Sequence, residues 1–196
     1  MSEAQTLTPQ GVLSFPHLFQ PKPPAPGADP RFSCVLVFTP EQQESDQFKA
    51  MEKAIRATAK ERFGDQMPRG LRNPIRETAE KKHFDNFPAG SKFVSLWSKQ
   101  DSQPKVVDAN VQHVTVPGDV FAGQIARASY RAFAYNTSGN AGVSLYLNNV
   151  QICKADAERL DGRMSAENEF DKVAGGTTPA AAGTELDDDD GDDPFG

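Results

Sequence analysis

The chain has 196 residues, with 21 basic and 27 acidic side chains, a formal net charge of -6 and two cysteines. This length is enough for one domain with a hydrophobic core and some additional unstructured chain. It contains no run approaching the ~18 apolar residues of a membrane span and does not start like a signal peptide, so we expect a cytosolic protein that spans no membrane. Taken alone, the isoelectric point near 5.1 also argues against nucleic-acid binding.

The charge is unevenly distributed along the chain. Residues 173–196 hold seven acids and no base, so residues 1–172, with 21 bases and 20 acids, carry a net charge of +1. Residues 49–105 alone contain 13 bases and 7 acids. The acidity therefore belongs to the end of the chain, and the rest has a basic centre.

The first predicted elements are two strands separated by a loop. Residues 11–15 predict a short strand, and the proline-rich stretch 21–30 predicts a loop because proline cannot donate a ladder hydrogen bond. Residues 31–38 give the strongest strand signal in the chain. Cys34 in this segment and Cys153 near the end of another predict buried, reduced thiols in preference to a disulfide or a metal pair.

A single helix is predicted over residues 39–64. Thr39 can cap its start and form a capping box with Gln42, and Gly64 suits its end. Two stripes of residues follow the helical period. The stripe predicted to pack on the core consists of Phe48, Met51, Ile55, Ala59 and Arg62. The stripe predicted to be a solvated basic face consists of Lys49, Lys53, Arg56 and Lys60.

The remaining chain predicts an irregular basic connection and then several short strands. The connection covers residues 65–90, and the strands are expected at 92–99, 105–107, 111–116, 120–136 and 143–153. Six or seven short strands with one helix predict a mainly β fold, a small antiparallel Greek-key barrel with an embedded helix. We expect the folded domain to span residues 1–172 and a disordered acidic tail to span 173–196.

Aromatic and basic side chains share faces on two of these strands. Phe93, Trp97 and Lys99 alternate with Val94 and Leu96. In the later strand Ala126, Ala128, Tyr130, Ala132 and Ala134 alternate with Arg127, Ser129, Arg131, Phe133 and Tyr135. Such a face is hard to bury without unpaired cations, whereas single-stranded nucleic acid offers bases for stacking and phosphates for the cations. A bulge would instead place Phe133 and Tyr135 in the core.

The sequence offers little catalytic chemistry. His17, His83 and His113 lack metal-ligand spacing, and no phosphate-binding loop or nucleophile elbow is present. Asp108 and Asp119 precede predicted strands and are typical of turn or cap residues, although nuclease carboxylates remain an alternative. We therefore predict a protein that is not an enzyme and needs no metal or cofactor.

The end of the chain is low in complexity and strongly acidic. It places one aromatic residue after a run of carboxylates, in Asp187, Asp188, Asp189, Asp190, Asp192, Asp193 and Phe195. A tail that serves only solubility is one interpretation. The alternative is an anchor for a basic, apolar pocket on a partner protein, or for a groove built for phosphates and bases.

Several sequence blocks resemble a family of bacteriophage single-stranded-DNA-binding proteins. The C-terminal block is Gly-Val-Ser-Leu-Tyr-Leu-Asn-Asn-Val-Gln at 142–151, followed by similar residues at 161–163 and 165–170, and further blocks lie at 11–19, 71–76 and 126–130. The resemblance implies an OB-fold that coats single-stranded DNA during phage replication and recombination. It also implies an acidic tail that recruits replication proteins, although such tails typically end on the aromatic residue and here Gly196 follows Phe195.

The charge pattern and the mixed faces predict a groove that binds single-stranded DNA without regard to sequence. The predicted phosphate contacts are Arg72, Arg76, Lys92, Lys99, Lys105, Arg127 and Arg131, and the predicted base-stacking rings are Trp97, Tyr130, Phe133 and Tyr135. We expect the tail to compete with DNA for this groove, and a homodimer is possible. The alternatives are a strand-annealing recombination factor, an acidic interaction protein that mimics DNA, and a nuclease.

Overall fold

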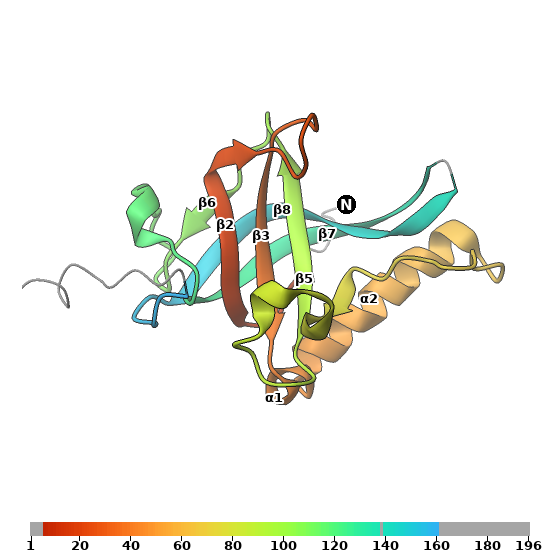
Figure 1. Cartoon of the computed structure of the whole chain (residues 1–196), viewed down its shortest axis with the longest axis horizontal. Helices are drawn as coiled ribbons and strands as arrows, with labels where there is room; N and C mark the ends of the chain where they lie inside the picture. Colours follow the sequence, from red (N-terminus) through yellow and green to blue (C-terminus); the bar gives the residue numbers. More distant parts are fainter. Residues whose placement is uncertain (1–5, 138, 161–196) are drawn as a thin grey trace, which may run out of the picture. The chain divides into compact units, whose positions relative to one another are not determined.

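The computed structural model describes residues 6–137 and 139–160, so the predicted tail lies outside the described residues (Figure 1). The strands are β1 (Thr6–Leu7), β2 (Gly11–Lys22), β3 (Arg31–Phe38), β4 (Ile75–Glu77), β5 (Lys92–Lys99), β6 (Lys105–Val107), β7 (Ile125–Thr137) and β8 (Asn140–Lys154). The helices are α1 (Pro40–Gln43) and α2 (Asp46–Phe63), with short 3-10 turns at Thr78–Glu80, Lys82–Phe84 and Pro117–Asp119.

Five strands close into a barrel in the order β7-β2-β3-β5-β8, and the pairing of β7 with β8 completes the ring. Strand β1 extends the sheet beside β7, β4 pairs with β5, and β6 pairs with β8. The predicted small barrel is confirmed, but β5 and β6 both run parallel to β8. Parallel neighbours are possible here because long connections, rather than tight hairpins, separate these strands in the chain.

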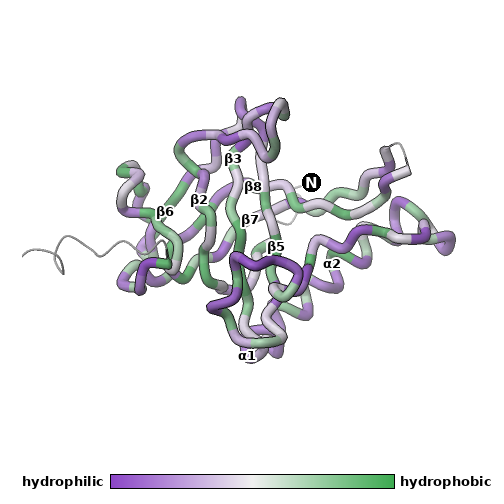
Figure 2. Tube along the Cα trace, viewed as in Figure 1, coloured by the Kyte–Doolittle hydropathy of each residue, from purple (hydrophilic) through white to green (hydrophobic). Residues whose placement is uncertain are grey.

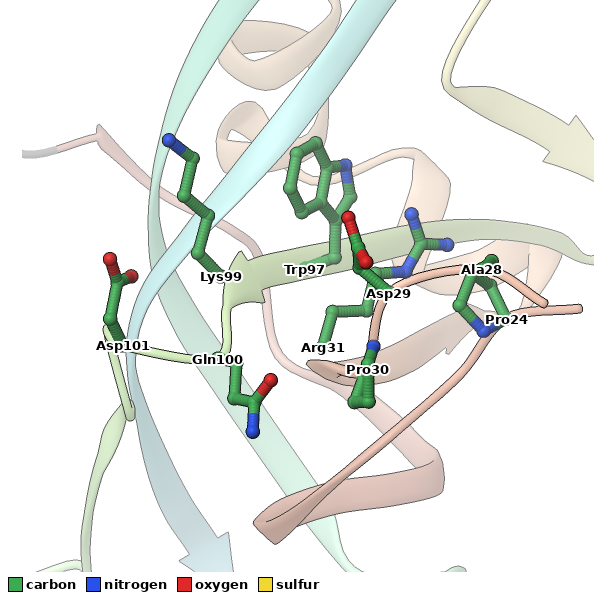
Figure 3. Close-up of a pocket in the computed structure, with 9 residues that line it drawn as sticks. All are labelled: Pro24, Ala28, Asp29, Pro30, Arg31, Trp97, Lys99, Gln100 and Asp101. Atoms are coloured by element: carbon green, nitrogen blue, oxygen red, sulfur yellow. The ribbon is translucent and has the colours of Figure 1, made fainter.

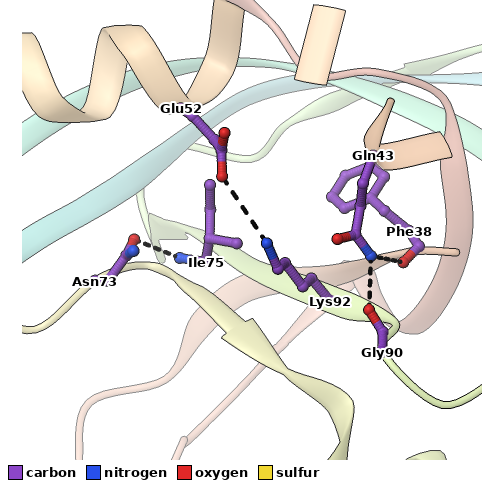
Figure 4. Close-up of polar contacts among 7 residues, drawn as sticks. All are labelled: Phe38, Gln43, Glu52, Asn73, Ile75, Gly90 and Lys92. Carbon is purple, nitrogen blue, oxygen red and sulfur yellow. Dashed lines mark hydrogen bonds and ion pairs between the residues drawn. The ribbon is translucent and has the colours of Figure 1, made fainter. Parts of the chain in front are cut away.

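The predicted helix is interrupted near its start. The Thr39 capping box is present: the Thr39 hydroxyl accepts from the Gln42 N–H, and the Thr39 N–H donates to the Gln42 side chain. Ser45 then caps a second start by accepting from the Phe48 N–H at 3.3 Å, so α1 ends and α2 begins. The side-chain amide of Gln43 donates to the carbonyls of Phe38 and Gly90, which ties α1 to the end of β3 and the start of β5 (Figure 4).

Helix α2 covers the inner side of the long β7–β8 hairpin (Figure 1). Its buried residues are Phe48, Met51, Ile55 and Ala59, and they join the main core with Ala126, Ala128 and Tyr130 of β7. Along α2 hydrophobic and hydrophilic stretches alternate, as the predicted stripe requires (Figure 2). Arg62, predicted on this stripe, is exposed because it lies in the last turn, beyond the core.

In two segments, prolines and side-chain hydrogen bonds give the backbone a course that the sequence did not predict. Strand β2 continues to Lys22, and its two register shifts accommodate Pro16 and Pro21, which cannot donate to the ladder. Residues 111–116 form a turn and a single bridge rather than a strand. The Asp108 carboxylate accepts from the N–H groups of Asn110 and Gln112, at 2.8 Å each, and so holds the chain in that turn.

Both cysteines are free, as predicted. Cys34 is fully buried in β3, and burial raises the pKa of its thiol to about 12. Cys153 in β8 is only partly buried. No helix in the described residues is long and apolar enough to cross a membrane.

Candidate nucleic-acid interface

Five side chains from five neighbouring strands form one continuous row across the barrel sheet. Arg131 of β7 is the register partner of Tyr146 in β8, and Tyr146 is the partner of Trp97 in β5. Trp97 in turn lies opposite Ser33 of β3, and Ser33 lies opposite His17 of β2. Register partners point to the same face with Cβ atoms about 5 Å apart, so these residues form a contiguous strip, called the central row below.

The central row lies on the outer face of the barrel. In β5 the side chains that alternate with Trp97, those of Leu96 and Ser98, are buried on the inner face. In β7 the alanines and Tyr130 face α2, so Arg131 and Phe133 point away from it. Strand alternation therefore sends aromatic and basic side chains outward together, as the sequence predicted.

Trp97 is the centre of an aromatic cluster. Its ring centroid lies 6.0 Å from that of Phe133 and 5.8 Å from that of Tyr146, both in edge-on geometry. The indole N–H donates to the Ser144 hydroxyl at 2.9 Å, which fixes the orientation of the ring. The Arg31 guanidinium lies over the ring, 5.2 Å from its centroid. The cluster thus presents preorganised aromatic surface beside a cation.

Cations flank the aromatic cluster on both sides. The Arg131 guanidinium lies 5.5 Å from the Tyr146 centroid, and Lys99 is the register partner of Arg31 at the end of β5. Within the described residues none of these three cations has an ion-pair partner. Burial lowers the pKa of Arg31, but an arginine remains charged at neutral pH. The cluster therefore carries positive charge that is available to an anionic ligand.

Two pockets open beside the stacked pair of Arg31 and Trp97. The larger, of about 780 Å³, lies under the β2–β3 loop and is lined by residues that include Pro24, Asp29, Arg31, Trp97, Lys99 and Asp101 (Figure 3). The smaller, of about 290 Å³, is lined in part by His17, Lys22 and Ser33. Burial, with a smaller effect from the nearby Lys22 cation, lowers the pKa of His17 and so favours its neutral form.

The β7–β8 hairpin brings two further predicted residues together near its end. Tyr135 is the register partner of Gly142, and a Cβ atom on Gly142 would stand only 2.7 Å from the Tyr135 Oη and 2.9 Å from the Arg72 Cβ. The Arg72 guanidinium donates to Asn140 at 2.9 Å, and its backbone forms a bridge to Gly142. Tyr135 and Arg72 thus extend the outer face beyond Phe133.

Arg127 of β7 and Lys105 of β6 lie toward the end of the sheet opposite Tyr135. The Arg127 Nε donates to the Gln151 side chain at 2.8 Å, and the Gln151 amide donates to the Asp108 carbonyl. Lys105 is exposed on β6, where its backbone N–H donates to the Asn149 side chain. Arg127 shares β7 with Arg131 of the central row and Lys105 lies on β6 beside β8, but both cations lie outside the aromatic cluster.

Two predicted DNA contacts, Tyr130 and Lys92, lie on the inner side of the barrel, and the assignment of the buried Tyr130 as a stacking ring is wrong. Tyr130 is only 2% exposed, because it shares the inner face of β7 with the alanines, and burial raises its pKa to about 12. Lys92 is half-buried against α2, with its Nζ 4.0 Å from the Glu52 carboxylate and 5.7 Å from the Phe48 centroid (Figure 4). Even-numbered positions of these strands face the core, which leaves neither side chain in the aromatic cluster.

Arg76 lies on β4, away from the aromatic cluster. Its guanidinium pairs with the Glu80 carboxylate, and its Cζ lies 5.4 Å from the Phe93 centroid. Phe93 is itself buried in a second cluster with Val37 and Phe84. The predicted phosphate contact at Arg76 is therefore already paired with a carboxylate in the structure.

Sequence reasoning missed three members of the cluster, namely Arg31, Ser144 and Tyr146. All three occur at alternating positions of predicted strands, so the side of the sheet to which each side chain points could have been inferred. Their proximity to Trp97 depends on the parallel pairing of β5 with β8, which no local pattern indicates.

A small closed barrel with aromatic rings and cations on one outer face is typical of OB-fold proteins that bind single-stranded nucleic acid. The family model described as the single-stranded-DNA-binding protein of Enterobacter phage Enc34 matches residues 5–180. The chain therefore belongs to this family of phage single-stranded-DNA-binding proteins.

Solved structures share the fold of this chain. The single-stranded-DNA-binding protein of bacteriophage Enc34 in complex with single-stranded DNA is 18% identical, with a TM-score of 0.62 over 78% of this chain and 87% of that one. The single-stranded-DNA-binding protein gp2.5 of bacteriophage T7 is 14% identical, with a TM-score of 0.56 over 89% of this chain and 97% of that one. The search of curated proteins found no match.

Proposed function

We propose that this protein binds single-stranded DNA, largely without regard to sequence, on the outer face centred on Trp97. The observation that carries the proposal is the aromatic cluster of Trp97, Tyr146 and Phe133 with Arg31 and Arg131 over its rings. Family membership and the solved complex of the Enc34 protein with single-stranded DNA support it.

In this geometry the rings bind the bases of the DNA and the cations bind its phosphates. Bases stack on the exposed aromatic surface, where each stack contributes roughly 1–3 kcal/mol. Arg31, Lys99 and Arg131 neutralise phosphates, and each neutralised phosphate adds about 0.7 to the slope of log affinity against log salt. Both terms act on any base sequence, since every base has a π-face and every nucleotide has a phosphate.

The biological role follows from the family. We propose that the protein coats and protects single-stranded DNA during phage replication and recombination in the host cytoplasm, acting as a binding protein rather than an enzyme. The described residues include no group of three or more histidines, cysteines or acids that could hold a metal ion. Asp108, an alternative nuclease carboxylate, is engaged in its turn instead.

Trp97→Ala tests the proposed site. The protein is titrated with labelled oligo-dT and with a duplex of equal length, and the matched control is Phe87→Ala, which removes a half-buried ring packed on Phe84, outside the aromatic cluster. We expect the wild type to prefer the single strand and Trp97→Ala to bind it at least about fivefold more weakly, with the control unchanged. Absence of wild-type binding to oligo-dT at low salt would refute the proposal and favour an acidic interaction protein.

The acidic tail has a separate proposed role, in competition with DNA and in recruiting replication and recombination proteins. Seven acids in 24 residues give it the charge of a DNA competitor, and a flexible segment of that length has a reach of roughly 25–30 Å. Truncation after Lys172 should tighten DNA binding, most strongly at low salt, and make its salt dependence steeper, because salt also weakens the competing tail. Equal affinities of full-length and truncated protein at low salt would contradict competition.

We also propose that the protein forms a homodimer in solution. Light scattering of the full chain over a range of concentrations distinguishes a monomer of 21.3 kDa from a dimer. A constant monomer mass at all concentrations would reject it.

A further inference from the structure

The larger pocket beside Trp97 contains two carboxylates in a region that is otherwise cationic. Asp101 accepts a hydrogen bond from the Ser102 hydroxyl at 3.0 Å. Asp29 lies on the β2–β3 loop two residues before Arg31, and its carboxylate has neither a hydrogen bond nor an ion pair with the described residues. Figure 3 shows the Asp29 carboxylate and the Arg31 guanidinium beside the Trp97 indole, whereas the Lys99 ammonium points away from them.

A carboxylate at this position opposes the binding of a DNA backbone. It repels phosphates, and the neighbouring Arg31 and Lys99 would bind them better without it. A carboxylate beside a stacking ring attracts cations and groups that donate hydrogen bonds. In single-stranded DNA the donors are on the edges of the bases, which are not engaged in pairing.

Guanine matches this arrangement better than the other bases do. Its Watson–Crick edge carries two adjacent donors, N1–H and the N2 amino group, which can donate side by side to the two oxygens of one carboxylate. Thymine has one donor on this edge, at N3, and adenine and cytosine have one amino group each. Guanine O6 is also an acceptor, and Arg31 supplies donors from the same side of the pocket.

We propose that this pocket is a guanine subsite, in which the base contacts Trp97 and Arg31 and donates N1–H and N2–H to the Asp29 carboxylate. The proposal rests on the proposed function, because the pocket adjoins the general binding face. The walls fit a base: Pro24, Ala28 and Pro30 are apolar, and proline restricts the conformations of the loop. One such subsite gives a preference at one nucleotide and leaves the rest of the strand bound without regard to sequence.

The test compares oligonucleotides that differ only in one kind of base. Repeats of the trinucleotide TTG are compared with TTT, TTA and TTI, where inosine lacks the N2 amino group, and isolated guanines avoid quadruplex formation. We expect wild-type protein to bind the TTG repeat at least about fivefold more tightly than TTT or TTA, with the inosine repeat intermediate.

The decisive variant is Asp29→Asn, which replaces one carboxylate oxygen with a donor. We expect it to bind all four oligonucleotides with similar affinity and to bind TTT no more weakly than wild type. Asp101→Asn is the matched control, since it removes a charge from the same pocket but should retain the preference for TTG. Asp29→Asn does not create a cavity, and its unfolding midpoint verifies that it folds.

The outcomes separate the subsite from the general function. Tight binding of TTT without a preference for TTG would overturn the guanine subsite and leave the general function standing. A preference for TTG that survives Asp29→Asn would overturn the role of Asp29. Failure of the wild type to bind TTT or TTG would instead contradict the proposed function itself.

Discussion

The substitution Gly142→Ala should displace Tyr135 from the binding face without unfolding the protein. The new Cβ would stand 2.7 Å from the Tyr135 Oη, 2.9 Å from its Cζ and 2.9 Å from the Arg72 Cβ. Optimal carbon contacts are about 3.5–4.0 Å, so both neighbours must give way by up to about 1 Å. The tyrosine side chain can turn aside, whereas Arg72 is held by backbone hydrogen bonds from its N–H to Ala141 and from Val143 to its carbonyl, so relief of its contact requires a shift of the backbone.

The net effect on stability should be a loss of up to about 2 kcal/mol, because two terms oppose each other. Alanine is favoured over glycine in a strand by roughly 0.5–1 kcal/mol. Overpacking costs about 1–3 kcal/mol in a rigid core; a half-buried ring near the end of a hairpin can move to relieve the Tyr135 part of it, but the Arg72 part remains. DNA binding should weaken as well, since loss of one base stack costs roughly 1–3 kcal/mol, or at least about fivefold in affinity.

A double-mutant cycle with Tyr135→Ala measures this coupling. Affinities for labelled oligo-dT are read by fluorescence anisotropy, and unfolding midpoints are measured in urea. Gly142→Ala should weaken binding in the wild-type background and have no further effect beside Tyr135→Ala. Gly118→Ala is the control, since a Cβ at Gly118 would have no neighbour within 4 Å. Equal weakening by Gly142→Ala in both backgrounds would refute the reasoning.

Three further predictions concern residues on the two sides of the barrel. Tyr130→Phe should leave the DNA affinity unchanged, and a loss of DNA affinity would contradict its inner position. The free energy of unfolding, measured by urea denaturation, should stay equal or rise by up to about 1 kcal/mol, because the buried hydroxyl has no hydrogen-bond partner among the described residues. Lys99→Ala should reduce the salt slope of DNA binding by about 0.7, whereas Lys92→Ala should leave it unchanged, and salt titrations of both variants check this. A thiol reagent should modify Cys153 in the native protein and Cys34 only after unfolding, as mass spectrometry of labelled peptides would show.

Local sequence patterns predicted the elements whose signals are local. The strand bounds at residues 31–38, 92–99 and 105–107 agree with β3, β5 and β6, and alternation placed Trp97 and Arg131 on their faces correctly. The same alternation had put Tyr130 among the inward alanines, so its assignment as a stacking ring contradicted the pattern. Burial of that face under α2 explains the outcome.

Features that depend on distant contacts were not predictable in this way. The parallel pairing of β5 with β8 brings Tyr146 and Ser144 to Trp97, although about 50 residues separate them in the chain. Lys92 is a second example: its charge predicted a phosphate contact, whereas the structure places it near Glu52, which comes from α2. Charge alone indicates which residues could bind phosphate, and only tertiary structure shows which of them already have a partner.

Trp97 provides the most direct measurement, because it is the only tryptophan in the chain and the centre of the proposed binding face. Its fluorescence is followed while the full chain is titrated with oligo-dT at a series of salt concentrations. The account predicts a saturable change in emission, because a base that stacks on the cluster alters the surroundings of the indole. It also predicts an affinity that falls steeply with salt, with a slope of about 2 if Arg31, Lys99 and Arg131 each neutralise one phosphate. Unchanged emission at saturation, with binding verified by anisotropy of the labelled DNA, would show that the DNA binds elsewhere.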